Sequence, residues 1–249
     1  MPDLNGSLTV PPLRSASSRS VITTPLILAV CAAVLGLAAC HSDDSTAPRT
    51  ASAVSVLSGD SQSGTVGAAL AAPVVLQVND QNGKALAGVA VNITVGTASG
   101  SVPSAQMTTD ANGQLTVSWT LGTVAGTDTL GIQAGSLAAV QVLATASPGL
   151  PASIMVTAGD AQSAAAGSAL ATPLTVKVVD QYGNAVPNVT VTFSDDASGA
   201  LTATTVTTDA FGVATDALTF GPNAGQDDVT ASVDTPSGTV TTTLHETAM

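Results

Sequence analysis

Apolar and polar residues alternate in several short stretches of the chain beyond residue 50. Within residues 114–121 every second position is apolar, and residues 89–95 and 189–193 show the same pattern. The apolar positions are Leu115, Val117, Trp119 and Leu121; Val89, Val91, Ile93 and Val95; and Val189, Val191 and Phe193. Because successive side chains of a strand point to opposite faces, this alternation predicts strands with one buried and one solvated face.

Turn signals separate these stretches. Asp-Gln-x-Gly stands at residues 80–83 and again at 180–183, and Asn112-Gly113 is a further glycine turn. Glycine adopts a positive φ, and an aspartate side chain accepts nearby amides, so both residues favour tight loops. About seven short strands in roughly 95 residues are typical of a β-sandwich. No amphipathic helical pattern follows Cys40, so the predicted fold class is all-β.

The chain contains an internal repeat. Gly-Asp-x-Gln-Ser at residues 59–63 recurs at 159–163, an offset of 100 residues, as does Asp-Gln-x-Gly. After a one-residue deletion, Thr-Thr-Asp-Ala-x-Gly at 108–113 recurs at 207–212. This period is far longer than that of solenoid repeats, which predicts that each copy is a whole domain.

The N-terminal segment has the order of a secretory signal peptide. Arg14 and Arg19 precede an apolar run from Leu26 to Ala39, which ends in small residues before Cys40. The run has roughly 14 residues, whereas a bilayer-spanning helix needs about 20, so an uncleaved transmembrane anchor is the weaker alternative. Leu-Ala-Ala-Cys at 37–40 resembles the lipobox of bacterial lipoproteins.

That resemblance implies cleavage before Cys40, acylation of its sulfur and its amino group, and a mature protein held to the membrane by lipid. In the lipoprotein family of Gram-negative cells, an aspartate after the cysteine retains the protein in the inner membrane. This chain has His41 there. The resemblance therefore implies an outer-membrane lipoprotein of the cell envelope.

A second resemblance covers both repeats. The repeated motifs, together with Leu-Ala-x-Pro at 70–73 and 170–173 and Trp-Thr-Leu-Gly at 119–122, resemble the bacterial Ig-like domain of the Big-1 type, known from the invasin and intimin adhesins. The resemblance implies two tandem Ig-like β-sandwiches. The second copy has Leu218 in place of Trp119 and Asp195-Asp196 in its middle loop. These departures leave open whether the copies share a binding surface.

The expected organisation follows from these patterns. Residues 1–40 form the signal peptide, 41–50 a polar leash, 51–147 the first Ig-like domain, 148–151 a linker and 152–247 the second domain. The linker contains Pro148 and Pro151, which restrict its flexibility and predict a semi-rigid rod.

Composition excludes several functions. After the lipobox the only Lys and Arg residues are Arg49, Lys84 and Lys177, against 16 acids. Nucleic-acid binding needs clustered basic residues, and docking on anionic lipid headgroups needs them too, so neither is expected. No cysteine follows Cys40, so no disulfide or thiolate metal site holds the domains.

Catalytic groups are sparse as well. The only histidines are His41 and His245, near the two ends of the mature chain, and there is no glycine-rich phosphate loop. We therefore expect no enzyme and no cofactor. A buried carboxylate pair that lined a pocket would be the structural evidence against this expectation.

Paired acids offer one alternative chemistry. Asp195, Asp196, Asp227 and Asp228 could supply oxygen ligands to calcium, which takes about 6–8 of them, although they lack the EF-hand spacing. Four further aspartates precede glycine turns, and we expect their side chains to accept hydrogen bonds from backbone amides of these turns. These are Asp80, Asp110, Asp180 and Asp209.

The aromatic residues complete the picture. Trp119 occupies an inward position of its strand, which favours core packing over a role as a ligand platform, and Tyr182 lies in a turn and is expected to be exposed. The favoured function is a lipid-anchored, non-catalytic envelope protein that acts in adhesion or as a structural spacer. The alternative is a glycan- or protein-binding module that uses loop tips of the second sandwich.

Overall fold

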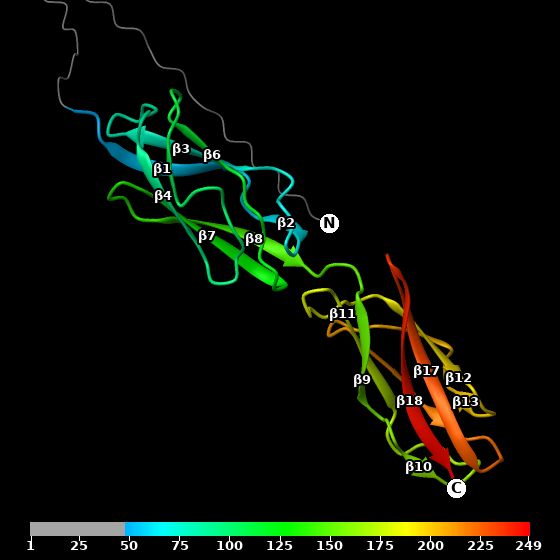
Figure 1. Cartoon of the computed structure of the whole chain (residues 1–249). Coiled ribbons are helices and arrows are strands. Elements are labelled where there is room, and N and C mark those ends of the chain that lie inside the picture. Colours follow the sequence, from blue (N-terminus) through cyan, green and yellow to red (C-terminus); the bar gives the residue numbers. More distant parts are fainter. Residues whose placement is uncertain (1–47) are drawn as a thin grey trace, which may run out of the picture. The chain divides into compact units, whose positions relative to one another are not determined.

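The computed structural model describes residues 48–249, and these residues form only strands, turns and loops. The predicted signal peptide, Cys40 and most of the predicted leash lie outside the described residues. Within the described part, no helix has the length and apolar character needed to cross a bilayer. The all-β fold with two Ig-like sandwiches is confirmed (Figure 1).

The first sandwich packs a three-stranded sheet against a five-stranded sheet. The smaller sheet is antiparallel and has the order β1-β3-β6, formed by β1 (Ala51–Ser58), β3 (Val74–Asp80) and β6 (Gln114–Val117). The larger sheet has the order β2-β8-β7-β4-β5, and its edge strand β2 pairs parallel to β8. Its strands are β2 (Gln62–Thr65), β4 (Ala90–Val95), β5 (Gln106–Thr108), β7 (Gly126–Ala134) and β8 (Val140–Ser147).

The second sandwich repeats this topology. One sheet has the order β15-β11-β9, formed by β9 (Ser153–Ala158), β11 (Leu174–Val179) and β15 (Val213–Asp216). The other has the order β10-β18-β17-β12-β14, and β13 and β16 form a separate two-stranded antiparallel sheet. These strands are β10 (Ser163–Ala164), β12 (Thr190–Asp195), β13 (Ala200–Leu201), β14 (Thr205–Thr207), β16 (Leu218–Thr219), β17 (Gly225–Thr235) and β18 (Gly238–Ala248).

The core of each sandwich consists of the alternating apolar positions. Trp119 is 1% exposed, and its indole Nε1 donates a hydrogen bond to the carbonyl oxygen of Ser99 at 2.8 Å. A buried Trp needs such a partner for its N–H, so its role in core packing is confirmed. In the second sandwich Phe193 is the largest buried side chain and takes the position of Ile93.

The glycine-turn aspartates bond to their own turns, as predicted. Asp80 Oδ1 accepts the amides of Asn82 and Lys84 at 2.9 and 2.8 Å. Asp110, Asp180 and Asp209 accept the amides two and four residues ahead in the same way. The glycine that follows has a positive φ, for example 73° at Gly83, which any other residue would adopt with strain.

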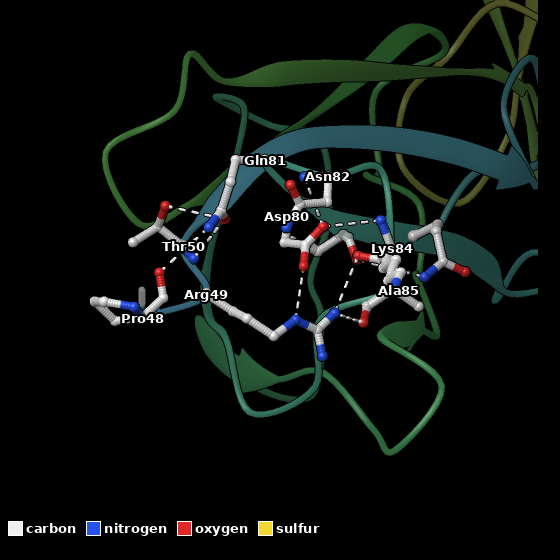
Figure 2. Close-up of polar contacts among 10 residues, drawn as sticks. Pro48, Arg49, Thr50, Asp80, Gln81, Asn82, Lys84 and Ala85 are labelled. Atoms are coloured by element: carbon white, nitrogen blue, oxygen red, sulfur yellow. Dashed lines mark hydrogen bonds and ion pairs between the residues drawn. The ribbon is translucent and has the colours of Figure 1, made fainter. Parts of the chain in front are cut away.

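The second carboxylate oxygen of two of these aspartates holds the chain that enters each sandwich. In the first sandwich Arg49 Nε lies 2.6 Å from Asp80 Oδ2, and the same guanidinium donates to the Ala85 carbonyl (Figure 2). In the second, Asp180 Oδ2 accepts the Gly149 amide at 2.8 Å. The hydrogen bond from Arg49 holds the pKa of Asp80 below its ordinary value.

We expect Arg49→Gln to raise the pKa of Asp80 toward its ordinary value of 3.8. The pKa of Asp80 is lower in the folded state than in the unfolded state. The ion pair therefore stabilises the sandwich at pH values above the unfolded-state pKa. This stabilisation disappears as the pH falls through the folded-state pKa. Carboxyl NMR titration of Asp80 and urea unfolding at several pH values measure both effects. Lys84→Gln is the matched control, because its exposed ammonium makes no ion pair within the described residues. An equal stability loss at neutral pH and at a pH below the folded-state pKa of Asp80 would contradict the prediction.

Phe193→Ala should destabilise the second sandwich by about 3–5 kcal/mol, because it leaves a cavity among buried strands. Phe193→Ile copies the first sandwich at this position and should cost less. Urea unfolding followed by far-UV circular dichroism measures the loss. Trp119 is the only tryptophan and lies in the first sandwich, so its fluorescence transition serves as the internal control and should stay unchanged.

Candidate functional site

Three aspartates meet at one end of the second sandwich. Asp195 is the last residue of β12, Asp196 follows it, and Asp227 lies near the start of β17. One carboxylate oxygen from each of the three residues lies within 4.8 Å of the others. The cluster of Asp195, Asp196 and Asp227 is called the acidic cluster below.

Strand pairing creates the acidic cluster. β12 lies beside β17 (Figure 1) and pairs antiparallel with it. Asp195 lies opposite Val229, so Asp195 and Asp227 both point to the core face of the sheet. Asp196 extends the pairing, since its amide donates to the Asp228 carbonyl at 3.1 Å and its Oδ1 accepts the Asp228 amide at 2.9 Å. The cluster therefore joins two segments about 30 residues apart in sequence.

Two of the carboxylates in this cluster are incompletely paired. Asp227 is 3% exposed, and the Oδ1 atoms of Asp195 and Asp227 are buried without a hydrogen-bond partner. A Cβ atom built on Gly199 would lie 3.2 Å from Asp195 Oδ1 and 3.2 Å from Asp227 Oδ2. The two carboxylates thus flank Gly199, and a larger residue there would crowd them.

The electrostatic consequence falls on Asp227. Its burial, and then the adjacent Asp195 carboxyl group, raise the pKa of Asp227 to about 7, with smaller contributions from the charges of Asp196 and Asp228. Burial disfavours the charged form, and neighbouring like charges disfavour it further.

Asp228 points away from the acidic cluster. Neighbouring residues of a strand face opposite sides, so Asp227 is buried while Asp228 is partly exposed. Asp228 Oδ1 accepts Gln226 Nε2 at 2.9 Å and lies 3.0 Å from His245 Nδ1. The hydrogen bond from Gln226, and then that of His245, lower the pKa of Asp228, while Asp228 raises the pKa of His245. The structure therefore brings three of the four predicted calcium ligands together.

Glu246 is a buried acid that the sequence reasoning missed. It lies opposite Asp227 in the β17–β18 pair and is completely buried. Its Oε2 accepts the Gln162 amide at 2.7 Å, its Oε1 has no partner, and burial raises its pKa. Its burial could have been predicted from the sequence, because Glu246 stands two residues after Leu244 in an alternating strand, where an apolar residue is expected.

A surface pocket adjoins the acidic cluster. It has a volume of about 320 Å³ and is lined on one side by Asp196 and Asp227. Ser198, Asn223 and Gln226 contribute further polar groups, and the remaining lining residues are glycines and alanines. The pocket gives water and small ions access to a carboxylate that is otherwise buried.

The first sandwich lacks this arrangement. Val95 and Gly96 occupy the positions of Asp195 and Asp196, as the matching strand registers show. Asp128, the equivalent of Asp227, is buried, and its Oδ2 accepts the Gly122 amide at 2.7 Å. Thr129 donates its amide to Ser99 Oγ at 3.0 Å, where the second sandwich uses Asp196. The clustering of acids is thus specific to the second copy.

Comparison with known proteins agrees with the fold. Residues 153–245 match the family described as bacterial Ig-like domain (group 1). A comparison with curated proteins finds no match.

Solved structures that resemble the chain include two proteins of Yersinia pseudotuberculosis. The chain is 22% identical to the adhesin InvE, with a TM-score of 0.38, 78% of this chain covered and 58% of InvE. For InvD the identity is 20%, the TM-score 0.49 and the coverage 79% and 57%. The adhesin FdeC of Escherichia coli is 20% identical, with a TM-score of 0.43 and coverage of 79% and 65%. The chain therefore spans less than two thirds of each of these three structures.

Proposed function

We propose that the chain is a lipid-anchored protein of the cell envelope whose two Ig-like domains act in adhesion or as a structural spacer. The observation that carries the proposal is that two sandwich domains follow the lipobox-like residues 37–40 in the sequence. The family match over residues 153–245 supports the nature of the second domain. The mature chain would begin at Cys40, continue through the leash 41–50, and present domains 51–147 and 152–247 joined by residues 148–151.

The anchor has a physical basis. Each buried methylene of an acyl chain contributes about 0.8 kcal/mol, and one chain alone binds only marginally. Acylation of both the sulfur and the amino group of Cys40 would supply at least two chains and make the attachment stable. The resemblance of residues 37–40 to a lipobox, with His41 after the cysteine, favours the outer membrane.

A non-catalytic role fits the acidic cluster better than an enzymatic one. A buried carboxylate pair beside a pocket is the feature that would favour an enzyme. Of the two acids that line the pocket, however, only Asp227 is buried, and Asp196 is exposed. Asp195, the third acid of the cluster, does not line the pocket, so no buried carboxylate pair faces it.

Cys40→Ala should abolish lipidation and release the protein from the membrane fraction. Wild-type protein should take up labelled palmitate, sediment with outer membranes and dissolve only in detergent. Cys31→Ala is the matched control, because Cys31 lies inside the apolar run that the signal cleavage would remove. Unlabelled wild-type protein would contradict the lipid anchor. Proteinase added to whole cells then separates a surface adhesin, which is digested, from an internal spacer, which is protected.

An exposed aromatic residue favours the alternative of ligand binding by loop tips. Phe211 is 73% exposed at the tip of the turn that begins at Asp209, where the first copy has Asn112. Tyr182 is 45% exposed in the turn that begins at Asp180, where the first copy has Asn82, so its predicted exposure is confirmed. Large aromatic residues on loops are preferred anchors for ligands.

Phe211→Asn should weaken any glycan binding by at least about 10-fold, as expected for loss of a central aromatic anchor. The measurement is a glycan array with the purified chain, followed by titration of each glycan that binds. Asn112→Ala in the first sandwich is the matched control, because it changes the equivalent turn residue. An array without binding, or equal affinities of wild type and Phe211→Asn, would contradict glycan binding by this loop.

A further inference from the structure

We propose that the acidic cluster binds one calcium ion, held by the carboxylates of Asp195, Asp196 and Asp227. The site belongs to the second sandwich alone. The proposal is independent of the lipid anchor and of any adhesive role, so either can fail without the other.

The first argument is the unpaired buried oxygen. Asp227 is only 3% exposed, and its Oδ1 accepts no hydrogen bond. One of its carboxylate oxygens nevertheless lies within 4.8 Å of a carboxylate oxygen of Asp195 and of Asp196. Buried polar atoms in folded proteins are nearly always paired, and an unpaired charged group costs the most. A cation between the carboxylates would satisfy these oxygens, including the unpaired Oδ1 of Asp195.

The second argument is the shortage of positive charge. Beyond residue 150 the sequence has ten acids and one basic residue other than histidine, Lys177, which lies on β11. Among the described residues of this sandwich, the ion pair is formed by His245 and Asp228. Asp228 faces the opposite side of β17 from Asp227. No side chain of the described structure therefore neutralises the acidic cluster, and a bound cation would.

The donor set identifies the ion. All three side chains offer carboxylate oxygens, and Ser198 and Asn223 in the adjoining pocket add neutral oxygens beside room for water. Calcium takes about 6–8 oxygens in flexible geometry, whereas magnesium demands a near-ideal octahedron and gives up water reluctantly. Zinc and copper prefer nitrogen or sulfur ligands, which the acidic cluster lacks.

The first sandwich supplies an internal comparison. Its equivalent of Asp227 has a backbone amide as partner, and its equivalents of Asp195 and Asp196 are Val95 and Gly96. The fold therefore does not need the two extra acids for its own closure. Their addition leaves three adjoining carboxylates, of which Asp195 and Asp227 each have a buried oxygen without a hydrogen-bond partner.

Isothermal titration of the full chain with calcium chloride, after treatment with a chelator, tests the site. We expect one calcium per chain and at least about 10-fold weaker binding of magnesium chloride. Asp227→Asn and Asp195→Asn should each weaken calcium binding by at least about 10-fold, since each removes a charged ligand. Asp234→Asn is the matched control, because this exposed aspartate on β17 lies outside the cluster.

A second variant guards against misfolding. Asp195→Val combined with Asp196→Gly copies the first sandwich, so it should fold and lose calcium binding. Calcium should raise the melting temperature of the wild-type second sandwich, seen by circular dichroism, and leave the Trp119 fluorescence transition of the first sandwich unchanged. No calcium binding by wild type at millimolar concentration, or equal binding by wild type and the folded double variant, would overturn the proposal.

Discussion

A buried aspartate that accepts backbone amides is the interaction on which both sandwiches depend. Asp80 is the last residue of β3, and Asp180 directly follows β11, the central strand of the smaller sheet in each sandwich. The two residues are 2% and 3% exposed. One oxygen of each closes the glycine turn, and the other holds the entering chain through Arg49 or Gly149. A charge can be buried in this way only because every oxygen that needs a donor finds one. The turn, the entry of the chain and the register of the first strand are thereby coupled.

The two copies use buried positions differently. Asp216 and Glu246 stand where the strand registers of the first copy place Val117 and Ala144. Asp216 is satisfied by the amides of Ala203 and Ala217, at 3.1 and 2.8 Å, so its burial follows the same rule as Asp180. Asp195, Asp227 and Glu246 break the rule, because each leaves one buried oxygen unpaired. The second sandwich has thus exchanged apolar packing for carboxylates that its own backbone does not fully pair.

Local patterns predicted the fold and named the acids of the cluster as candidate calcium ligands, but they did not predict which of these acids meet in space. Alternation identified the buried faces around Trp119 and Phe193, and the repeat identified two whole domains, because both signals are periodic within one strand or one copy. The grouping of Asp195 with Asp227 depends on how β12 pairs with β17 about 30 residues later, and no local pattern encodes that register. Adjacency in sequence was misleading for Asp227 and Asp228, since the pleat sends them to opposite faces.

The acidic cluster and the proposed export reinforce each other physically. Calcium sites of extracellular modules bind with dissociation constants of about 10⁻⁴–10⁻³ M. A site of that strength is empty where calcium is scarce and filled where it reaches millimolar concentration. The second sandwich of an exported chain would therefore gain stability where calcium reaches that concentration, by mass action of the bound ion. A lipid tether at Cys40, as proposed, would keep the exported protein at the membrane.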